Sequence, residues 1–353
     1  MASVYSLPAP IPLFIAKLLP DLKALDALRQ SCSLFAVVFA RHAVELLEHV
    51  MLATLHEDTI VELRTYVLVS ADRRRWQQTE GAMEHLHANA NAPLDRGVSI
   101  EAVSLALRAF SALHSLCSQV VERKFDELYG LPHQHPTTNL VNRSLEYLLN
   151  AESVAYDVPT PWPVDWIEEQ RILQALFHLR SCALLGQDPD RLITRPGRRI
   201  PGFSLVHECS HLFDACVLEI VRRTTVLPQQ SDWQAPAATP LAHCDPSRRH
   251  VHDEFCKTSW KTYGWLIFHA PLCHVRPTPF TPDDWPVFRE LGLGVWSRRR
   301  LEEDLELGHR ASSPLKGTAC VREDGGKRHA CSHEIIFTWW ILYKAQRSCS
   351  ASC

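Results

Sequence analysis

The chain has 353 residues, of which 46% are hydrophobic and 22% are charged, and this composition is that of an ordinary globular protein. A chain of this length forms one large domain or two to three smaller ones. The formal net charge of -3 lacks the basic excess that most nucleic-acid-binding proteins carry, so we expect no nucleic-acid partner.

The cysteines and the apolar segments bear on the compartment. The twelve cysteines are scattered along the chain rather than set in a close framework, so we expect mostly reduced thiols. The apolar stretch near the start is broken by Pro8, Pro10 and Pro12, which is unlike a secretory signal. The apolar run 335–343 is too short to cross a bilayer, which takes about 20 residues. These features predict a cytoplasmic or nuclear protein without a membrane partner.

The first forty residues predict three short helices. Apolar side chains recur at helical spacing on both sides of an Asp21-Leu22 turn. Three helices of this size bury too little surface to be stable alone. We therefore expect this segment to complete its core against a partner or against the rest of the chain.

Further along, the chain predicts helices joined by proline-rich loops, and strong period-2 strand patterns are missing. A long helix is expected over about residues 100–128, with Ser99 as its cap and Gly130 as its stop. Another helix begins with a capping-box-like pair, Asp165 and Glu168. Other helices are expected over 203–223, after residue 284 and over 296–305, with loops over 131–138, 157–164, 186–202 and 226–250.

These patterns predict an all-α protein in which an N-terminal three-helix module packs on a larger irregular helical array. The expected parts are the module over residues 1–45, a helical domain over 46–311 and an irregular tail over 312–353. The tail is assigned from its serine, glycine and cysteine content, which surrounds a single apolar run.

The order of signals in the first forty residues matches a known module. Leu7 and Pro8 form an extended lead into the first predicted helix, with Ile11 just inside it, and Cys32 and Phe35 form a Cys-x-x-Phe pair on the third. This order resembles the F-box, the helical module through which substrate receptors dock onto SCF-type ubiquitin ligases. The resemblance covers little more than a tenth of the chain.

Two stretches downstream resemble a broad group of fungal F-box proteins. Residues 166–176 look like the acidic-Arg-Ile-x-Arg-Ala-Leu helix of that group, with Gln174 in place of the second arginine. Residues 291–301 look like its Gly-hydrophobic-Trp-x-x-x-Arg-Leu element. The N-terminal module departs from the family at Pro10, where an acidic residue is usual, and at Ser33, where a basic residue is common.

The resemblance implies a substrate receptor that binds a Skp-type adaptor, and through it the cullin ligase, and that recruits a protein client with its C-terminal helices. Such a receptor acts by proximity, does no chemistry and needs no cofactor. The resemblance also implies that Ile15 and Leu19 form the buried face of the first helix, with Leu25 and Leu28 on the inner side of the second. The residues expected to contact the adaptor, or to form the core that presents it, are Leu7, Pro8, Ile11, Ile15, Leu19, Leu22, Leu25, Leu28 and Phe35.

A literal His-Glu-x-x-His string, running from His207 to His211, gives an alternative. On a helix this spacing places two imidazoles on one face to bind Zn²⁺, with Glu208 positioned to activate water. A zinc metallopeptidase would use His207 and His211 as ligands and Glu208 as general base. The metzincin glycine and third histidine are absent, because Asp214 and Val217 stand at those positions. A second alternative is a non-catalytic helical scaffold in which the N-terminal helices only complete the core.

Overall fold

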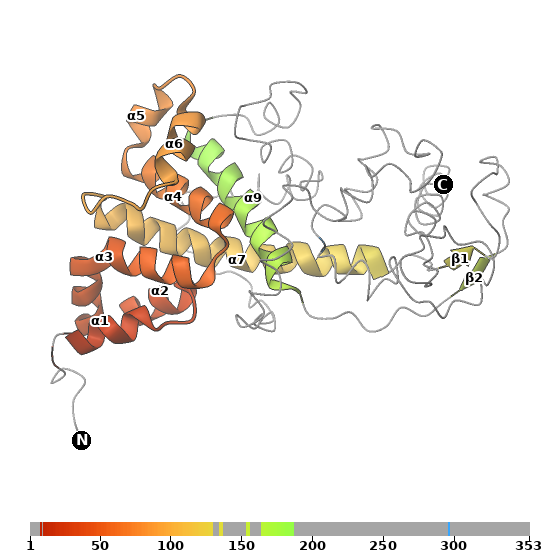
Figure 1. Ribbon diagram of the computed structural model, residues 1–353, viewed down its shortest axis with the longest axis horizontal. Coiled ribbons are helices and arrows are strands. Elements are labelled where there is room, and N and C mark those ends of the chain that lie inside the picture. The colour runs from red at the N-terminus through yellow and green to blue at the C-terminus, as the bar shows by residue number, and fades with distance from the viewer. Residues whose placement is uncertain are drawn as a thin grey trace, which may run out of the picture. The chain divides into compact units, whose positions relative to one another are not determined.

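The computed structural model describes residue 8, residues 10–129, 134–136, 153–155 and 164–186, and residue 296. These residues are mostly helical (Figure 1), which confirms the all-α expectation for this part of the chain. The described residues also contain two strands, β1 (Gln134–Pro136) and β2 (Ser153–Ala155), which pair antiparallel. The strand β1 lies in a segment that the sequence predicted to be a loop. The helices are α1 (Pro10–Lys17), α2 (Leu22–Ser31), α3 (Ser33–Thr54), α4 (Glu57–Ala71), α5 (Arg73–Gln77), α6 (Ala82–Ala90), α7 (Ile100–Tyr129) and α9 (Trp166–Leu184).

The described residues form two compact units. The first contains α1 to α6, α7 as far as Gln119, and α9 from Glu169 onward. The second contains the rest of α7, the strand pair, the start of α9 and Trp296. Within the second unit, the rings of Phe125 and Trp296 stack with their centroids 5.1 Å apart. Both candidate sites described below lie in the first unit.

Polar side chains fix where several helices begin. The side chain of Asp21 accepts a hydrogen bond from the Ala24 backbone N–H at 2.6 Å, which caps α2. Ser99 accepts in the same way from the backbone N–H of the third residue of α7, at 3.2 Å, and confirms the predicted cap. The Asp165 N–H donates to Glu168 Oε2 at 3.0 Å, the reciprocal bond expected of a capping box.

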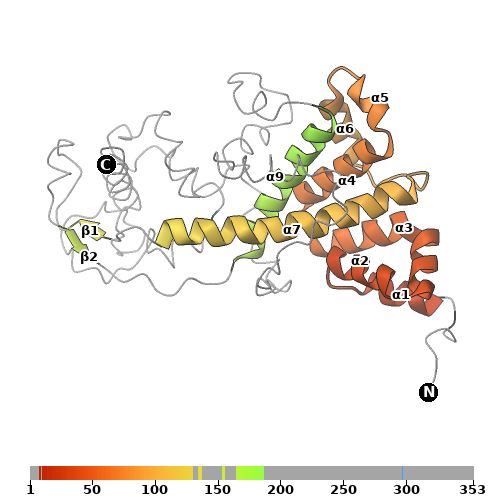
Figure 2. The same ribbon diagram turned by 180° about the vertical axis from the view of Figure 1, so that it is seen from behind.

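The core of the first unit lies where α4, α7 and α9 meet. The ribbon shows α9 crossing α7 in both views (Figures 1 and 2). The Phe177 ring of α9 lies 6.2 Å from the Phe110 ring of α7 and 5.8 Å from the Tyr66 ring of α4, measured between centroids. All three rings are buried, so these contacts fix the three helices against one another.

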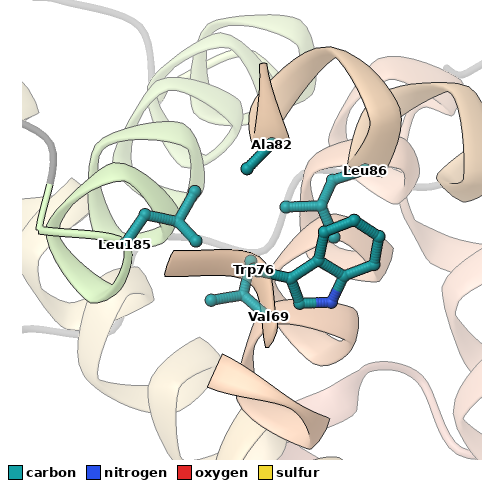
Figure 3. Packing of buried hydrophobic residues seen from close by; sticks show 5 residues of the cluster. All are labelled: Val69, Trp76, Ala82, Leu86 and Leu185. Carbon is teal, nitrogen blue, oxygen red and sulfur yellow. The ribbon is translucent and has the colours of Figure 1, made fainter. Parts of the chain in front are cut away.

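A second apolar cluster joins α4, α5, α6 and the end of α9. Figure 3 shows the Trp76 ring of α5 packed beside Leu86 of α6, with the side chains of Val69, Ala82 and Leu185 around them. All five members are buried, so the cluster anchors the short helix α6 beside α4. Its members are Val69, Trp76, Ala82, Leu86 and Leu185.

A buried ion pair joins α3 to α4. The Arg64 guanidinium donates two parallel hydrogen bonds to the Glu48 carboxylate, at 2.9 and 2.6 Å. It also donates to the Ala90 carbonyl at 3.2 Å, while the Leu94 N–H donates to Glu48 at 3.0 Å. Because both charged groups use several partners, this pair is a satisfied structural element.

Residues 100–121 of α7 are long and apolar enough to cross a bilayer by length and composition alone. The core helix of a globular protein meets the same criteria. Val103, Leu107 and Phe110 are buried within the first unit. We therefore assign this stretch to the protein core.

The N-terminal helices α1 and α2 both pack on α3. Leu22 and Leu25 of α2 are buried, as is Phe35 of α3. The helix α3 has one residue with non-helical backbone angles, His42, and continues beyond the predicted module boundary at residue 45. The three helices expected in this segment are therefore present, and the third extends into the core of the first unit.

The expected buried face of α1 is wrong. Ile15 is 37% exposed and Leu19 is only half-buried, whereas Pro12 and Ala16 are the buried residues of this helix. Pro12 and Ala16 lie one turn apart and therefore on the same side of α1. Because both side chains are small, this side allows the α1 backbone to lie close to the neighbouring helix α3. Apolar residues occur all around α1, and the fit to α3 decides which of them face inward.

Candidate functional sites

The solvent-facing side of α1 is apolar. Ile11, Phe14 and Ile15 of α1 follow one another at helical spacing. Leu18 directly follows α1 and continues its last turn, because its backbone N–H bonds to the Phe14 carbonyl at 3.2 Å, so all four residues share one side. Phe14 is 62% exposed and Leu18 67%, and the other two are also exposed. We call these four residues the outward face of α1. Contiguous exposed apolar side chains of this kind are typical of a surface that another molecule covers.

Polar contacts hold α1 in position on α3. The Lys17 ammonium at the end of α1 lies 2.5 Å from Glu45 Oε1 of α3, and His42 Nδ1 lies 3.0 Å from the other carboxylate oxygen. Hydrogen bonds from Lys17 and His42 lower the pKa of Glu45 below its ordinary value of 4.5. The outward face is therefore presented by a helix that is attached on its opposite side.

Apart from Leu7, the predicted adaptor-contact residues fall into three groups by their exposure. Leu7 lies outside the described residues. Pro8, Ile11 and Ile15 are exposed and available to a partner, and Leu19 and Leu28 are half-buried. Leu22, Leu25 and Phe35 are buried and belong to the core that supports α1. Phe14 and Leu18, the most exposed residues of the outward face, were missed because the family motif does not mark them.

The His-Glu-x-x-His string, with His207, Glu208 and His211, lies outside the described residues. The metallopeptidase alternative therefore stays a prediction from sequence.

A different group of ionisable side chains converges inside the first unit. Glu62 of α4, His87 of α6 and His178 of α9 are all buried. His87 Nε2 lies 3.1 Å from Glu62 Oε1, and His178 Nδ1 lies 3.2 Å from the same oxygen. The two imidazole rings stack at 18°, with centroids 5.7 Å apart. We call these three residues the Glu62 cluster.

The surrounding helices fix this geometry. The Gln170 carbonyl of α9 accepts a hydrogen bond from the Thr59 hydroxyl of α4 at 3.2 Å. The Gln170 side chain accepts another from the His56 N–H at 3.0 Å. These bonds set the position of α9 along α4, and the packing of Leu86 places the neighbouring His87 against both.

Burial and ion pairing act against each other within the cluster. Burial raises the pKa of Glu62, but His178 and His87 outweigh it and lower that pKa to about 2. Burial lowers the pKa of His178, but Cys182 and Glu62 outweigh it and raise that pKa well above its ordinary value of 6.5. Glu62 is therefore a carboxylate in the folded protein, and its charge is balanced from α9.

Three buried oxygen atoms around the cluster have no hydrogen-bond partner among the described residues. They are Glu62 Oε2, Thr65 Oγ1 and Ser181 Oγ. Thr65 follows Glu62 by one helical turn, and Ser181 follows His178 by one turn, so each hydroxyl shares a helix side with a cluster residue. An unsatisfied buried polar group is destabilising by about 1–3 kcal/mol, and a water molecule or ion is the usual explanation for one in a native protein.

Sequence reasoning missed the Glu62 cluster because no local spacing marks it. Glu62 and His178 lie 116 positions apart in the chain. The only sequence signal is the chemical type of the residues, and the chain has 19 histidines.

Comparison with known proteins gives no assignment. No family model matches the chain, and neither the curated proteins nor the solved structures include a significant match. A function for this chain therefore has to be argued from its own residues.

Proposed function

We propose that this chain is an F-box-type substrate receptor of an SCF ubiquitin ligase. In this proposal the outward face of α1 docks onto the Skp-type adaptor, and helices nearer the C-terminus recruit a protein client. The observation that carries the proposal is the exposed apolar stripe on α1, in the segment whose sequence resembles an F-box.

The physical basis is the burial of the stripe on binding. Phe14 and Leu18 are mostly exposed in the free chain, and full burial of a large apolar side chain contributes about 1.5–3 kcal/mol. The helix that carries them is seated on α3, so little conformational entropy is lost when a partner binds. A partner with a complementary apolar groove would recognise this face as a helix-in-groove ligand.

The mechanism is proximity. A receptor that holds its client near the ligase raises the effective concentration of the client's lysines at the ubiquitin-transfer centre. The receptor itself needs no catalytic residue for this role. Because Pro10 and Ser33 replace the charged residues usual in the family, the proposal relies on apolar contacts for adaptor binding.

A direct binding measurement with purified Skp-type adaptor tests the proposal. The full chain should bind, and the double variant Phe14→Glu/Leu18→Glu should lose most of the affinity, because it places charges in an apolar interface. Leu105→Glu is the matched control, since Leu105 is an exposed apolar residue of α7. Absence of binding by a folded wild-type chain, or an equal loss in the Leu105 variant, would contradict the proposal.

A helical scaffold without adaptor binding is the second candidate. The observation that favours it is the burial of Leu22, Leu25 and Phe35 where α2 packs on α3, since α3 is also a core helix of the first unit. A scaffold needs these buried residues but not the exposed ones. It predicts that Phe14→Glu/Leu18→Glu leaves every interaction of the chain unchanged, and the same variant therefore separates the two functions.

A further inference from the structure

We propose that Glu62, His87 and His178 bind one divalent transition-metal ion of the zinc type, which holds α4, α6 and α9 together. This site is independent of the proposed docking function and uses none of its residues.

The first argument is the spacing of the ligand atoms. The imidazole nitrogens lie 3.1 and 3.2 Å from Glu62 Oε1, and all three ligand atoms lie within 4.8 Å of one another. Zinc bonds of about 2.0–2.1 Å in a tetrahedral site place neighbouring ligand atoms about 3.3–3.4 Å apart. The two nitrogen–oxygen distances are therefore close to those of a zinc site, and the two imidazole nitrogens, within 4.8 Å of each other, would draw together around the ion.

The second argument is the chemistry of the donor set. Two imidazole nitrogens and one carboxylate oxygen suit zinc and its transition-metal neighbours, whereas calcium and magnesium prefer sites built of oxygen atoms alone. Three protein ligands leave a fourth position for water. The set is buried on three helices, so metal binding there would stabilise the fold as structural zinc sites do.

The third argument is a set of unpartnered buried oxygen atoms, one on Glu62 itself and two on residues one helical turn from Glu62 and from His178. Glu62 Oε2 and the hydroxyls of Thr65 and Ser181 are buried and have no hydrogen-bond partner in the described part of the chain. A metal ion would engage the carboxylate, and its bound water would offer hydrogen bonds to hydroxyls one turn along α4 and α9. The site thus accounts for atoms that the protein alone leaves unsatisfied.

Neighbouring groups also orient the ligands. Cys182 lies one turn after His178 and is buried with a free thiol, and it contributes to raising the pKa of His178. A group next to a metal-binding histidine can fix the orientation of its ring. We assign Cys182 as a positioning residue rather than a ligand, because the three-residue group within 4.8 Å does not include it.

The competing explanation is an ion cluster without metal, in which Glu62 is held by the two imidazoles. Both explanations use the same distances, so geometry alone does not separate them. They differ in what added metal does to the folded protein. A metal-free cluster gains no stability from zinc, whereas a metal site gains stability as free zinc rises.

The test uses the full-length chain, stripped with a chelator and then titrated with Co²⁺ and, separately, Zn²⁺. Co²⁺ should give the visible ligand-field absorption of a four-coordinate site, and Zn²⁺ should raise the midpoint of thermal unfolding. After exhaustive dialysis the wild type should retain about one equivalent of zinc more than His87→Ala or His178→Ala. His85→Ala is the matched control, since His85 is an exposed histidine of the same helix as His87.

A further control separates this site from the His-Glu-x-x-His string. The double variant His207→Ala/His211→Ala should keep the Co²⁺ absorption if the ion lies at the Glu62 cluster. Loss of the absorption in that variant alone, or a wild type that takes up no metal, would overturn the proposal. If His87→Ala fails to fold, the conservative His87→Gln and the wild-type titration still decide it.

Discussion

The outward face of α1 and the Glu62 cluster depart from ordinary protein architecture in opposite directions. On α1, large apolar side chains such as Phe14 face solvent. In the cluster, a carboxylate and two imidazoles are buried among three helices. Each arrangement is unfavourable by itself, because water solvates apolar surface poorly and the protein interior solvates charge poorly. The two proposals assign a different kind of partner to each, a protein surface to α1 and a metal ion to the cluster.

The largest expected effect comes from removing the carboxylate of the cluster. Glu62→Ala should lower the free energy of unfolding by about 3–5 kcal/mol, because it leaves a buried imidazolium without its counter-charge. Urea denaturation measures this. Glu57→Ala, at an exposed position of the same helix, should change stability by less than about 0.5 kcal/mol. Similar losses in the two variants would mean that Glu62 is not the centre of a buried ionic contact.

Substitutions at buried and at exposed positions of the N-terminal module should have different effects on stability and on adaptor binding. Leu22 is fully buried, so Leu22→Ala should lower the free energy of unfolding by about 2–5 kcal/mol. Phe14 is mostly exposed, so Phe14→Ser should change stability by less than about 0.5 kcal/mol while it weakens adaptor binding. Chemical denaturation and adaptor titration on both variants check this. A large loss of stability in Phe14→Ser would show that the chain itself covers the outward face.

Removing the Ser181 hydroxyl should have a smaller effect on stability, and it tests whether a metal-bound water is present at the cluster. In chelated protein, Ser181→Ala should leave stability unchanged or raise it by about 1 kcal/mol, because it removes an unsatisfied buried group. In zinc-loaded protein the same change should weaken metal binding, because the bound water loses a partner. Thermal unfolding with and without zinc measures both effects. An equal change in stability with and without zinc would show that the Ser181 hydroxyl does not hydrogen-bond to a metal-bound water.

The sequence correctly predicted features that depend on neighbouring residues in the chain, such as helix starts and caps. The start of α7 at Ile100 and the capping pair before α9 depend on residues within a few positions of one another, and both are confirmed. Hydrogen bonds between a cap and the first turn form in nearly any tertiary setting, so they can be read without knowing the fold.

The sequence did not predict the buried side of α1 or the Glu62 cluster, because both depend on contacts between elements that are distant in the chain. Apolar residues occur on every side of α1, yet Pro12 and Ala16 are the buried ones and Ile15 is exposed in the helix that packs on α3. The Glu62 cluster assembles from three helices, and two of its members lie 116 positions apart. No periodic pattern encodes such a meeting, because the pattern of one helix carries no information about which helix lies opposite.

The smallest expected effect concerns how firmly α1 is held. Hydrogen bonds from Lys17 and His42 lower the pKa of Glu45, so this carboxylate contributes stability above its ordinary value of 4.5 and loses that contribution as pH falls through the lowered pKa. The Glu45 side chain is 44% exposed, so the contribution should be at most about 1 kcal/mol and should shrink with added salt.

Glu45→Gln should remove this part of the pH dependence, whereas Glu80→Gln, at an exposed turn, should keep it. Urea denaturation from about pH 6 to about pH 3 measures the difference. If Glu45→Gln also leaves adaptor affinity intact, α1 is held on α3 mainly by the packing of Pro12 and Ala16. If affinity falls together with the ionic contact, the orientation of the outward face depends on Lys17, and binding should then be sensitive to salt as well.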